Sequence, residues 1–315
     1  MKINLAKTNF MVINGTDAEK QPLIVDNLTV KWCKKYKYLG CMFTADGRAS
    51  SAVAADAAAR MCQALKFTSF IEKNNDAPFY IKKKVFDACV MSSLLYGCET
   101  WLSADLRPIK RLYNMCIKTL LGVRHTTSND LCLIELGLPE LQATVYERQK
   151  TFFKTMSTAR ENMIDDPLQF ALRLCLGTRT LTSRYVQGLL SCNTNKKEES
   201  LAQMKQKITT NTQNSSRFEW FKTVNQPLSV NKLYTEKVSN INELHRVAWT
   251  RLRLSAHTLA IEQGRWNRRG RGRLRKSGCV PAVQCRTRST SSRTAPPHST
   301  SEGRTASLHW NTSRD

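Results

Sequence analysis

Adjacent carboxylates are the first residues of this chain whose types and spacing could do chemistry. The only Asp-Asp pair, Asp165-Asp166, lies in the stretch NMIDDPLQF, directly before Pro167. Paired carboxylates can hold the metal ions of phosphoryl-transfer enzymes, but acidic residues ahead of a proline also suit the start of a helix. Helix capping is the better explanation of this pair. We therefore expect no catalytic residue, no metal site and no cofactor.

Cysteine and histidine side chains are the next candidates for metal binding. The chain has 11 cysteines, scattered singly and without a CxxC pair. Cys279 and Cys285 are followed by His298 and His309, which lie far from them in the sequence. This spacing does not match a zinc-ligand set. Unpaired cysteines in odd number indicate a reducing compartment, so we expect a nuclear or cytoplasmic protein.

Positive charge is the strongest feature of the composition. The 315 residues include 49 Lys and Arg against 25 Asp and Glu, for a net charge of +24. This excess favours a phosphate-rich polymer as partner, because each phosphate that is neutralised releases counterions. An anionic membrane surface is the second choice, and a basic chain without a special partner is the third. No apolar run approaches 18 residues, so we expect no membrane span.

The elements that must position these charges begin with short strands. Residues 10–13 (FMVI) and the alternating stretch LIVDNLTVKW predict strands. The stretch YKYLGCMF, residues 36–43, predicts a further strand that ends at the turn Asp46-Gly47.

Helical periodicity follows from Ser50 or Ser51 to about residue 264. The first helix is expected to bury Met61, Ala64 and Leu65. The second carries two neighbouring apolar rows: Ile81, Val85, Ala88, Cys89 and Ser92; and Phe86, Val90 and Leu94. The third ends at Gly122, and its predicted buried stripe is Leu106, Ile109, Leu112, Cys116 and Leu120.

The predicted fold class is mainly α, with a short N-terminal β-hairpin or strands, a helical bundle and a disordered basic tail. We expect a β-containing start over residues 1–48, a bundle over 49–125 and a further helical region over 126–264. A solvated helix between polar linkers is predicted near 193–216. The Arg/Ser-rich tail, 265–315, cannot offset its ordering entropy.

An ordered set of segments resembles the reverse transcriptases of non-LTR (LINE-type) retrotransposons. The segments are INLAKTNFMVIN, YKYLG, SSLLYGCETW, LYNMCIKTLLGV and, further on, RLRLSAHTLAIEQGRWNRR. Each motif alone is weak, whereas their order and spacing are specific. The resemblance implies that residues 1–48 end a palm, that 49–125 form a thumb, and that Tyr38, Leu39 and Gly40 belong to a hairpin that grips the primer.

The resemblance and the charge together imply RNA or an RNA/DNA hybrid as partner, contacted through its backbone. Lys7 matches the lysine that the family places near the nucleotide. The residues predicted to contact nucleic acid are Lys7, Lys82, Lys83, Lys84, Lys110, Arg111, Lys118 and Arg124. A solvated helix face without a ligand is the alternative interpretation of the helical members of this set.

The matching segments lack the family's catalytic carboxylates. Polymerase chemistry uses two metal ions, which the family holds with an aromatic-x-Asp-Asp motif and a further upstream carboxylate. The match begins after both. We therefore expect a reverse-transcriptase fragment that is not an enzyme as it stands, with Mg²⁺ needed only by the full-length enzyme.

The tail also departs from the family, which carries a Cys/His cluster after the segment that RWNRR matches. Codons that encode the tail residues can be chosen so that a shifted reading frame encodes a peptide with zinc-binding Cys/His spacing. Our hypothesis is therefore that the tail is a frameshifted copy of a zinc motif. Two other functions remain open for the whole chain: a helical RNA-binding module with a host role, and a helical protein-interaction module.

Overall fold

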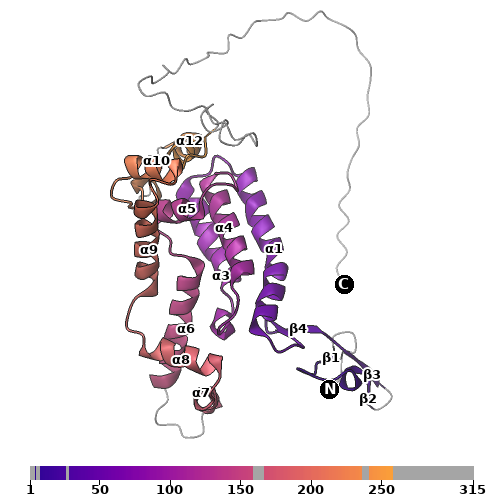
Figure 1. Ribbon diagram of the computed structural model, residues 1–315. Helices are drawn as coiled ribbons and strands as arrows, with labels where there is room; N and C mark the ends of the chain where they lie inside the picture. Colours follow the sequence, from indigo (N-terminus) through magenta and orange to yellow (C-terminus); the bar gives the residue numbers. More distant parts are fainter. Residues whose placement is uncertain (1–3, 5–7, 26–27, 159–166, 236–240, 258–315) are drawn as a thin grey trace, which may run out of the picture. The chain divides into compact units, whose positions relative to one another are not determined.

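A computed structural model describes residues 4, 8–25, 28–158, 167–235 and 241–257. These residues belong to one compact unit, Met1–Gly272, and a second unit, Arg273–Asp315, lies outside the described residues. The described chain is mainly helical with a few short N-terminal strands, which confirms the predicted fold class (Figure 1). The predictions for Lys7, for Asp165-Asp166 and for the disordered tail 265–315 fall outside the described residues.

The N-terminal strands form two small sheets. The first has the order β1-β3-β2, in which β1 (Asn9–Phe10) runs parallel to β3 (Leu28–Trp32) and β2 (Leu23–Val25) runs antiparallel to it. A short 3-10 helix, η1 (Ala18–Lys20), separates β1 from β2. The second sheet is the hairpin of β4 (Lys35–Tyr38) and β5 (Cys41–Thr44).

The residue pattern alone predicted one strand over residues 36–43, but the chain reverses within this stretch and forms a hairpin, as the resemblance implied. Leu39 has φ 47° and Gly40 has φ 87°, so both central residues of the turn are left-handed. Two-residue turns of this kind match the twist of antiparallel strands, and glycine enters them without a steric cost. The sequence YKYLGCMF is thus a complete hairpin with Leu39-Gly40 at its tip.

Helices make up the rest of the described chain. The first group is α1 (Ala49–Lys73), α2 (Phe79–Val85), the π-helical turn η2 (Phe86–Met91), α3 (Ser92–Leu94), the 3-10 turn η3 (Cys98–Thr100) and α4 (Arg107–Leu121). The second group is α5 (Asn129–Leu136), α6 (Leu141–Thr158), α7 (Pro167–Gly177), α8 (Leu181–Ser191), α9 (Lys196–Thr210), α10 (Ser216–Val224), α11 (Lys232–Thr235) and α12 (Glu243–Arg253).

One apolar core joins the two groups of helices. Helix α4 lies along α1 (Figure 1), and the ring of Phe86 lies 5.8 Å from that of Phe67 and 6.5 Å from that of Tyr113. Ile134 of α5 and Phe221 of α10 belong to the same buried cluster. The boundary predicted at residue 125 therefore lies within a shared core. A second, smaller cluster joins α6, α7 and α8 through Phe153, Leu172, Val186 and Leu189.

Helix α4 follows its predicted pattern closely. Four members of the expected stripe are fully or almost fully buried: Ile109, Leu112, Cys116 and Leu120. The helix ends at Gly122, whose φ of 70° places it in the left-handed region and lets its N–H bond to the Thr119 carbonyl at 3.0 Å. This is the C-terminal glycine cap that the sequence predicts.

Helices α1 and α9 differ from their predictions. Met61 and Leu65 are 41% and 56% exposed, although Ala64 between them is buried. The buried face of α1 contains the ion pair of Asp56 and Arg60 instead. Helix α9 is not fully solvated, because Met204 and Ile208 are part of the main core. In α1, tertiary packing buries a different face from the predicted one, whereas in α9 it buries two apolar residues of a helix that was predicted to be solvated.

Helix α12 is fixed to earlier helices by its charged residues. Arg253 pairs with Glu135 of α5 at 2.7 Å, and Arg251 donates a hydrogen bond to the carbonyl of Gly122 at 2.7 Å. Glu135 is completely buried, so its pairing with Arg253 offsets a large desolvation cost.

Candidate nucleic-acid interface

The β4–β5 hairpin carries lysines and aromatic residues in alternation. Lys34, Lys35, Tyr36, Lys37 and Tyr38, which we call the hairpin surface, are all exposed, and β4 is exposed along its whole length. Successive side chains of a strand point to opposite faces. Lys35 and Lys37 therefore lie on one face of β4, and Tyr36 and Tyr38 lie on the other.

The outer edge of β4 is open, because among the described strands β4 pairs with β5 alone. Tyr36 lies opposite Phe43, and the rings of Tyr38 and Phe43 lie 6.5 Å apart in an edge-on arrangement. A single strand of nucleic acid that crosses this edge would meet ammonium groups on one face and aromatic rings on the other. Phosphate neutralisation and base stacking are the two interactions that sequence-tolerant binding uses.

Tyr96 fixes the tip of the hairpin to the helices. Its hydroxyl donates a hydrogen bond of 2.8 Å to the carbonyl of Leu39. The ring of Tyr96 also lies against Gly40, where an added Cβ would come within 2.8 Å of the ring. Any larger residue at position 40 would therefore displace Tyr96. Two of the predicted grip residues, Leu39 and Gly40, are thus held in place, with Leu39 75% exposed at the tip.

A buried ion pair in α1 supports the base of the same hairpin. The main-chain N–H of Met42 bonds to the Asp56 carboxylate, and Arg60 lies 3.3 Å from Asp56. Arg60 also donates to the carbonyls of Leu94 and Tyr96, at 2.8 and 2.9 Å. Burial raises the pKa of Asp56, and the charge of Arg60 opposes that rise. The same two side chains therefore connect β5, α1 and the turn that holds Tyr96.

Lys82 does not belong to a phosphate-facing surface, contrary to prediction. Its side chain is buried, donates to the carbonyl of Asn75 at 2.7 Å and pairs with Glu243 at 2.9 Å. Arg246 pairs with the same glutamate at 2.6 Å. Burial of the Lys82 ammonium group without a counterion would cost a large desolvation free energy. Its pairing with Glu243 offsets that cost.

Two of the other predicted basic residues form ion pairs with acids. Lys83 pairs with Asp87 at 2.5 Å, and Lys110 pairs with Glu140 at 2.9 Å. Lys84 is exposed on α2. Arg124 is exposed in the loop that follows α4.

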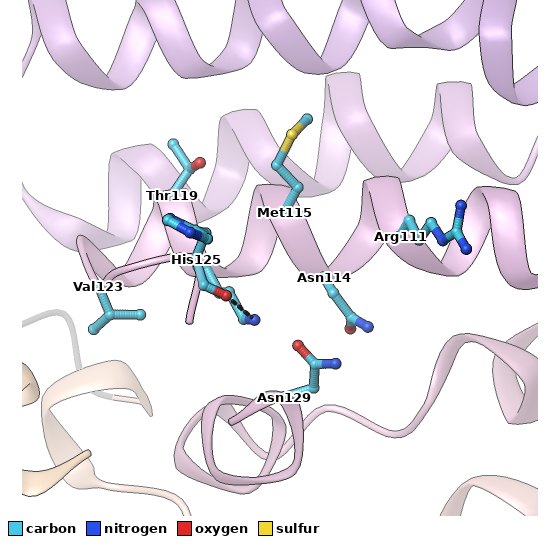
Figure 2. A pocket seen from close by; sticks show the side chains of 8 residues that line it. Arg111, Asn114, Met115, Thr119, Val123, His125 and Asn129 are labelled. Atoms are coloured by element: carbon cyan, nitrogen blue, oxygen red, sulfur yellow. Dashed lines mark hydrogen bonds between the residues drawn. The ribbon is translucent and has the colours of Figure 1, made fainter. Parts of the chain in front are cut away.

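Arg111 and Lys118 line a pocket of about 330 Å³ between α4, the following loop and the start of α5 (Figure 2). Its polar lining is Arg111, Asn114, Lys118, Thr119, His125 and Asn129. Lys118 donates a hydrogen bond of 2.7 Å to the carbonyl of His125. Burial lowers the pKa of Lys118. The structure thus brings two of the predicted residues to one concave site.

The lysines of the hairpin surface were missing from the predicted set. The signal that could have found them is the stretch KWCKKYKY, in which basic and aromatic residues alternate beside a turn. Among the described residues, no three His, Cys, Asp or Glu side chains gather where they could hold a metal ion. None of the described helices is both long enough and apolar enough to cross a membrane.

The chain matches no protein-family model, no curated protein and no solved structure. The interpretation of the hairpin surface and of the pocket therefore depends on the chemistry of their own side chains.

Proposed function

We propose that this chain binds RNA or an RNA/DNA hybrid through the phosphate backbone, and that it derives from the reverse transcriptase of a non-LTR retrotransposon. The observation that carries the binding proposal is the hairpin surface. Lys34, Lys35 and Lys37 make no ion pair with any acid that the structure describes, and they alternate with exposed tyrosines. Ammonium groups without a close acid favour a phosphate polyanion, although Lys37 keeps a longer-range attraction to Asp56. The exposed aromatic rings can in addition stack on unpaired bases of single-stranded RNA.

The proposed activity is binding without nucleotide transfer. The five segments that resemble the family do not include its aromatic-x-Asp-Asp motif. Primer extension on an RNA template, with magnesium and deoxynucleotides supplied, tests this part of the proposal. Extension by the purified chain would overturn it.

Salt-dependent binding tests the role of the hairpin. We expect the affinity of the intact chain for a 20-base-pair RNA/DNA hybrid, measured by fluorescence anisotropy, to fall steeply as salt rises. The double variant Lys35→Gln/Lys37→Gln should lower the slope of log affinity against log salt by about 1–2, since each lost phosphate contact lowers it by about 1. Lys205→Gln/Lys222→Gln removes the same charge from exposed sites on α9 and α10 and is the matched control.

Three results would count against the proposal. Equal losses in the two double variants would mean that total charge, and not the hairpin, sets the affinity. Binding that is insensitive to salt would exclude backbone contacts as its source. A strong preference for one RNA sequence would favour the alternative, an RNA-binding module with a host role.

A further inference from the structure

The pocket on α4 is lined by hydrogen-bond donors and contains no carboxylate. Arg111, Asn114 and Lys118 are spaced at i, i+3 and i+7, so they share one face of α4. Asn129 contributes from the first residue of α5. In Figure 2 the side-chain amides of Asn114 and Asn129 point toward one another across the pocket. The site therefore has cationic groups from one helix and amide donors from two.

The two cations form no close ion pair with a described acid, although, after the hydrogen bonds and charge of Arg107, the charge of Arg111 helps to lower the pKa of Asp105. Arg111 is exposed and forms no ion pair with a described carboxylate. Asp130, next to Asn129, is already paired with Lys207 at 2.5 Å. Lys118 is held toward the pocket by the carbonyl of His125, a neutral partner that leaves its positive charge uncompensated. An incoming anion would give both cations a counterion at close range.

Size and donor geometry decide which anion fits. A volume of about 330 Å³ lies at the lower end of the range for small-ligand sites, about 300–1,000 Å³. A phosphate group with an attached sugar is within that size. The guanidinium of Arg111 presents a planar fork that suits phosphate oxygens, and an ammonium acts as a point charge on the same group. Amide donors such as Asn114 and Asn129 can satisfy the remaining oxygens.

We propose that this pocket binds one phosphate group together with part of the sugar attached to it. Arg111 and Lys118 provide charge, and Asn114 and Asn129 provide neutral donors. The assignment of that phosphate to a nucleic-acid chain rests on the proposed function, whereas a free nucleotide would use the same chemistry. Helix α4 would then hold the sugar–phosphate backbone at one defined point.

Calorimetric titration of the intact chain with a nucleoside 5′-monophosphate tests the pocket directly. We expect one saturable site for the monophosphate and none for the matching nucleoside, because the phosphate supplies the charge. Arg111→Gln and Lys118→Gln should each weaken binding by about tenfold or more, since each removes a charge-assisted hydrogen bond. Arg184→Gln, at an exposed position of α8, is the matched control and should leave binding unchanged. Circular dichroism of each variant verifies its folding, and Arg111 is exposed, so its replacement leaves the core intact.

Competition identifies the source of the phosphate. Displacement of the monophosphate by an RNA/DNA hybrid would assign the pocket to the nucleic-acid backbone. Failure of the hybrid to displace it would leave a phosphate pocket for free nucleotides and would count against the nucleic-acid source alone. Lys35→Gln/Lys37→Gln should retain monophosphate binding, which separates this test from that of the hairpin. Absence of saturable binding, or an equal loss in Arg184→Gln, would overturn the phosphate pocket.

Discussion

The hydroxyl of Tyr96 and the carbonyl of Leu39 are joined by a hydrogen bond of 2.8 Å, across 57 positions of sequence. Tyr96 is the second residue after the short helix α3, and Leu39 is the first residue of the hairpin turn. Because the turn carbonyl faces a donor from the helical body, the tip of the hairpin is held at one position.

Removal of that hydroxyl should loosen the hairpin. We expect Tyr96→Phe to lower the free energy of unfolding by about 0.5–1.5 kcal/mol, the usual net contribution of one hydrogen bond. Urea denaturation measures this change, and amide exchange at Leu39 and Gly40 should become faster. Tyr36→Phe, at a tyrosine on the same hairpin, is the control. Equal effects of the two variants would show that the bond does not hold the turn.

The buried charges of α2 and α12 should respond unequally to neutralisation. Glu243→Gln leaves both Lys82 and Arg246 without a counterion, and we expect a loss of about 3–5 kcal/mol in unfolding free energy. Lys82→Met leaves Glu243 paired with Arg246 and should cost less, about 1–3 kcal/mol. Chemical denaturation measures the unfolding free energy of both variants. A larger loss in Lys82→Met than in Glu243→Gln would contradict the structure. Lys82→Met should also leave the salt slope of nucleic-acid binding unchanged.

Asp46 should titrate at unusually low pH. The hydroxyls of Ser51 and Thr44 and the N–H of Arg48 donate to its carboxylate, and these bonds lower its pKa from 3.8 to about 2. A depressed carboxylate pKa stabilises the folded state above about pH 4, and this contribution is lost as the pH falls toward 2. Carbon-detected NMR of the carboxyl group measures the midpoint. Ser51→Ala should raise the midpoint, whereas Ser50→Ala, in which the lost hydroxyl bonds to Asp105 instead, should not.

Cys192 should react with alkylating agents at neutral pH. Hydrogen bonds from the hydroxyls of Thr194 and Tyr146 lower its pKa to about 7, whereas burial raises the pKa of Cys116 to about 12. The thiolate is the reactive form, so brief treatment with iodoacetamide at pH 7 should modify Cys192 and spare Cys116. Mass spectrometry of the digest reads out both sites. Thr194→Val should slow labelling of Cys192 several-fold relative to Cys89, which is exposed and serves as an internal reference. An unchanged ratio would show that the hydroxyl does not activate the thiol.

Local signals predicted the helix ends and the most regular helix. Gly122 ends α4 and Pro167 begins α7, in both cases for reasons contained in a few neighbouring residues. The stripe of α4 repeats over four turns, and only one face of that helix is apolar. The predicted fold class depended on such signals and is confirmed.

Contacts between distant residues explain what could not be predicted. Nothing near Lys82 in the sequence indicates that Glu243 will pair with it, so the three consecutive lysines of α2 looked equivalent. In the α2 to α3 region, the row Phe86, Val90 and Leu94 is buried, while Ala88, Cys89 and Ser92 of the other row are exposed. The π-helical turn η2 changes the spacing of side chains within this region, and a period of 3.6 does not describe it.

The pocket was foreseeable only in part. Arg111 and Lys118 could be placed on one face of a helix from their spacing, but the loop that returns His125 and Asn129 to the same place is a tertiary feature. The lysines of the hairpin surface were not predicted for a different reason: the resemblance implied a hairpin at Tyr38, Leu39 and Gly40, but the residue pattern did not show that Lys35 and Lys37 lie on an open strand edge.

The pairing of α12 with α2 and α5 has a consequence for synthesis of the chain on the ribosome. Lys82 and Glu135 emerge long before Glu243 and Arg253, the residues that neutralise them. Until α12, the last of the described helices, leaves the exit tunnel, burial of those two charges would leave them without their counterions. The helical body therefore completes its folding late in translation, and chaperones would encounter its earlier helices in an unfinished state.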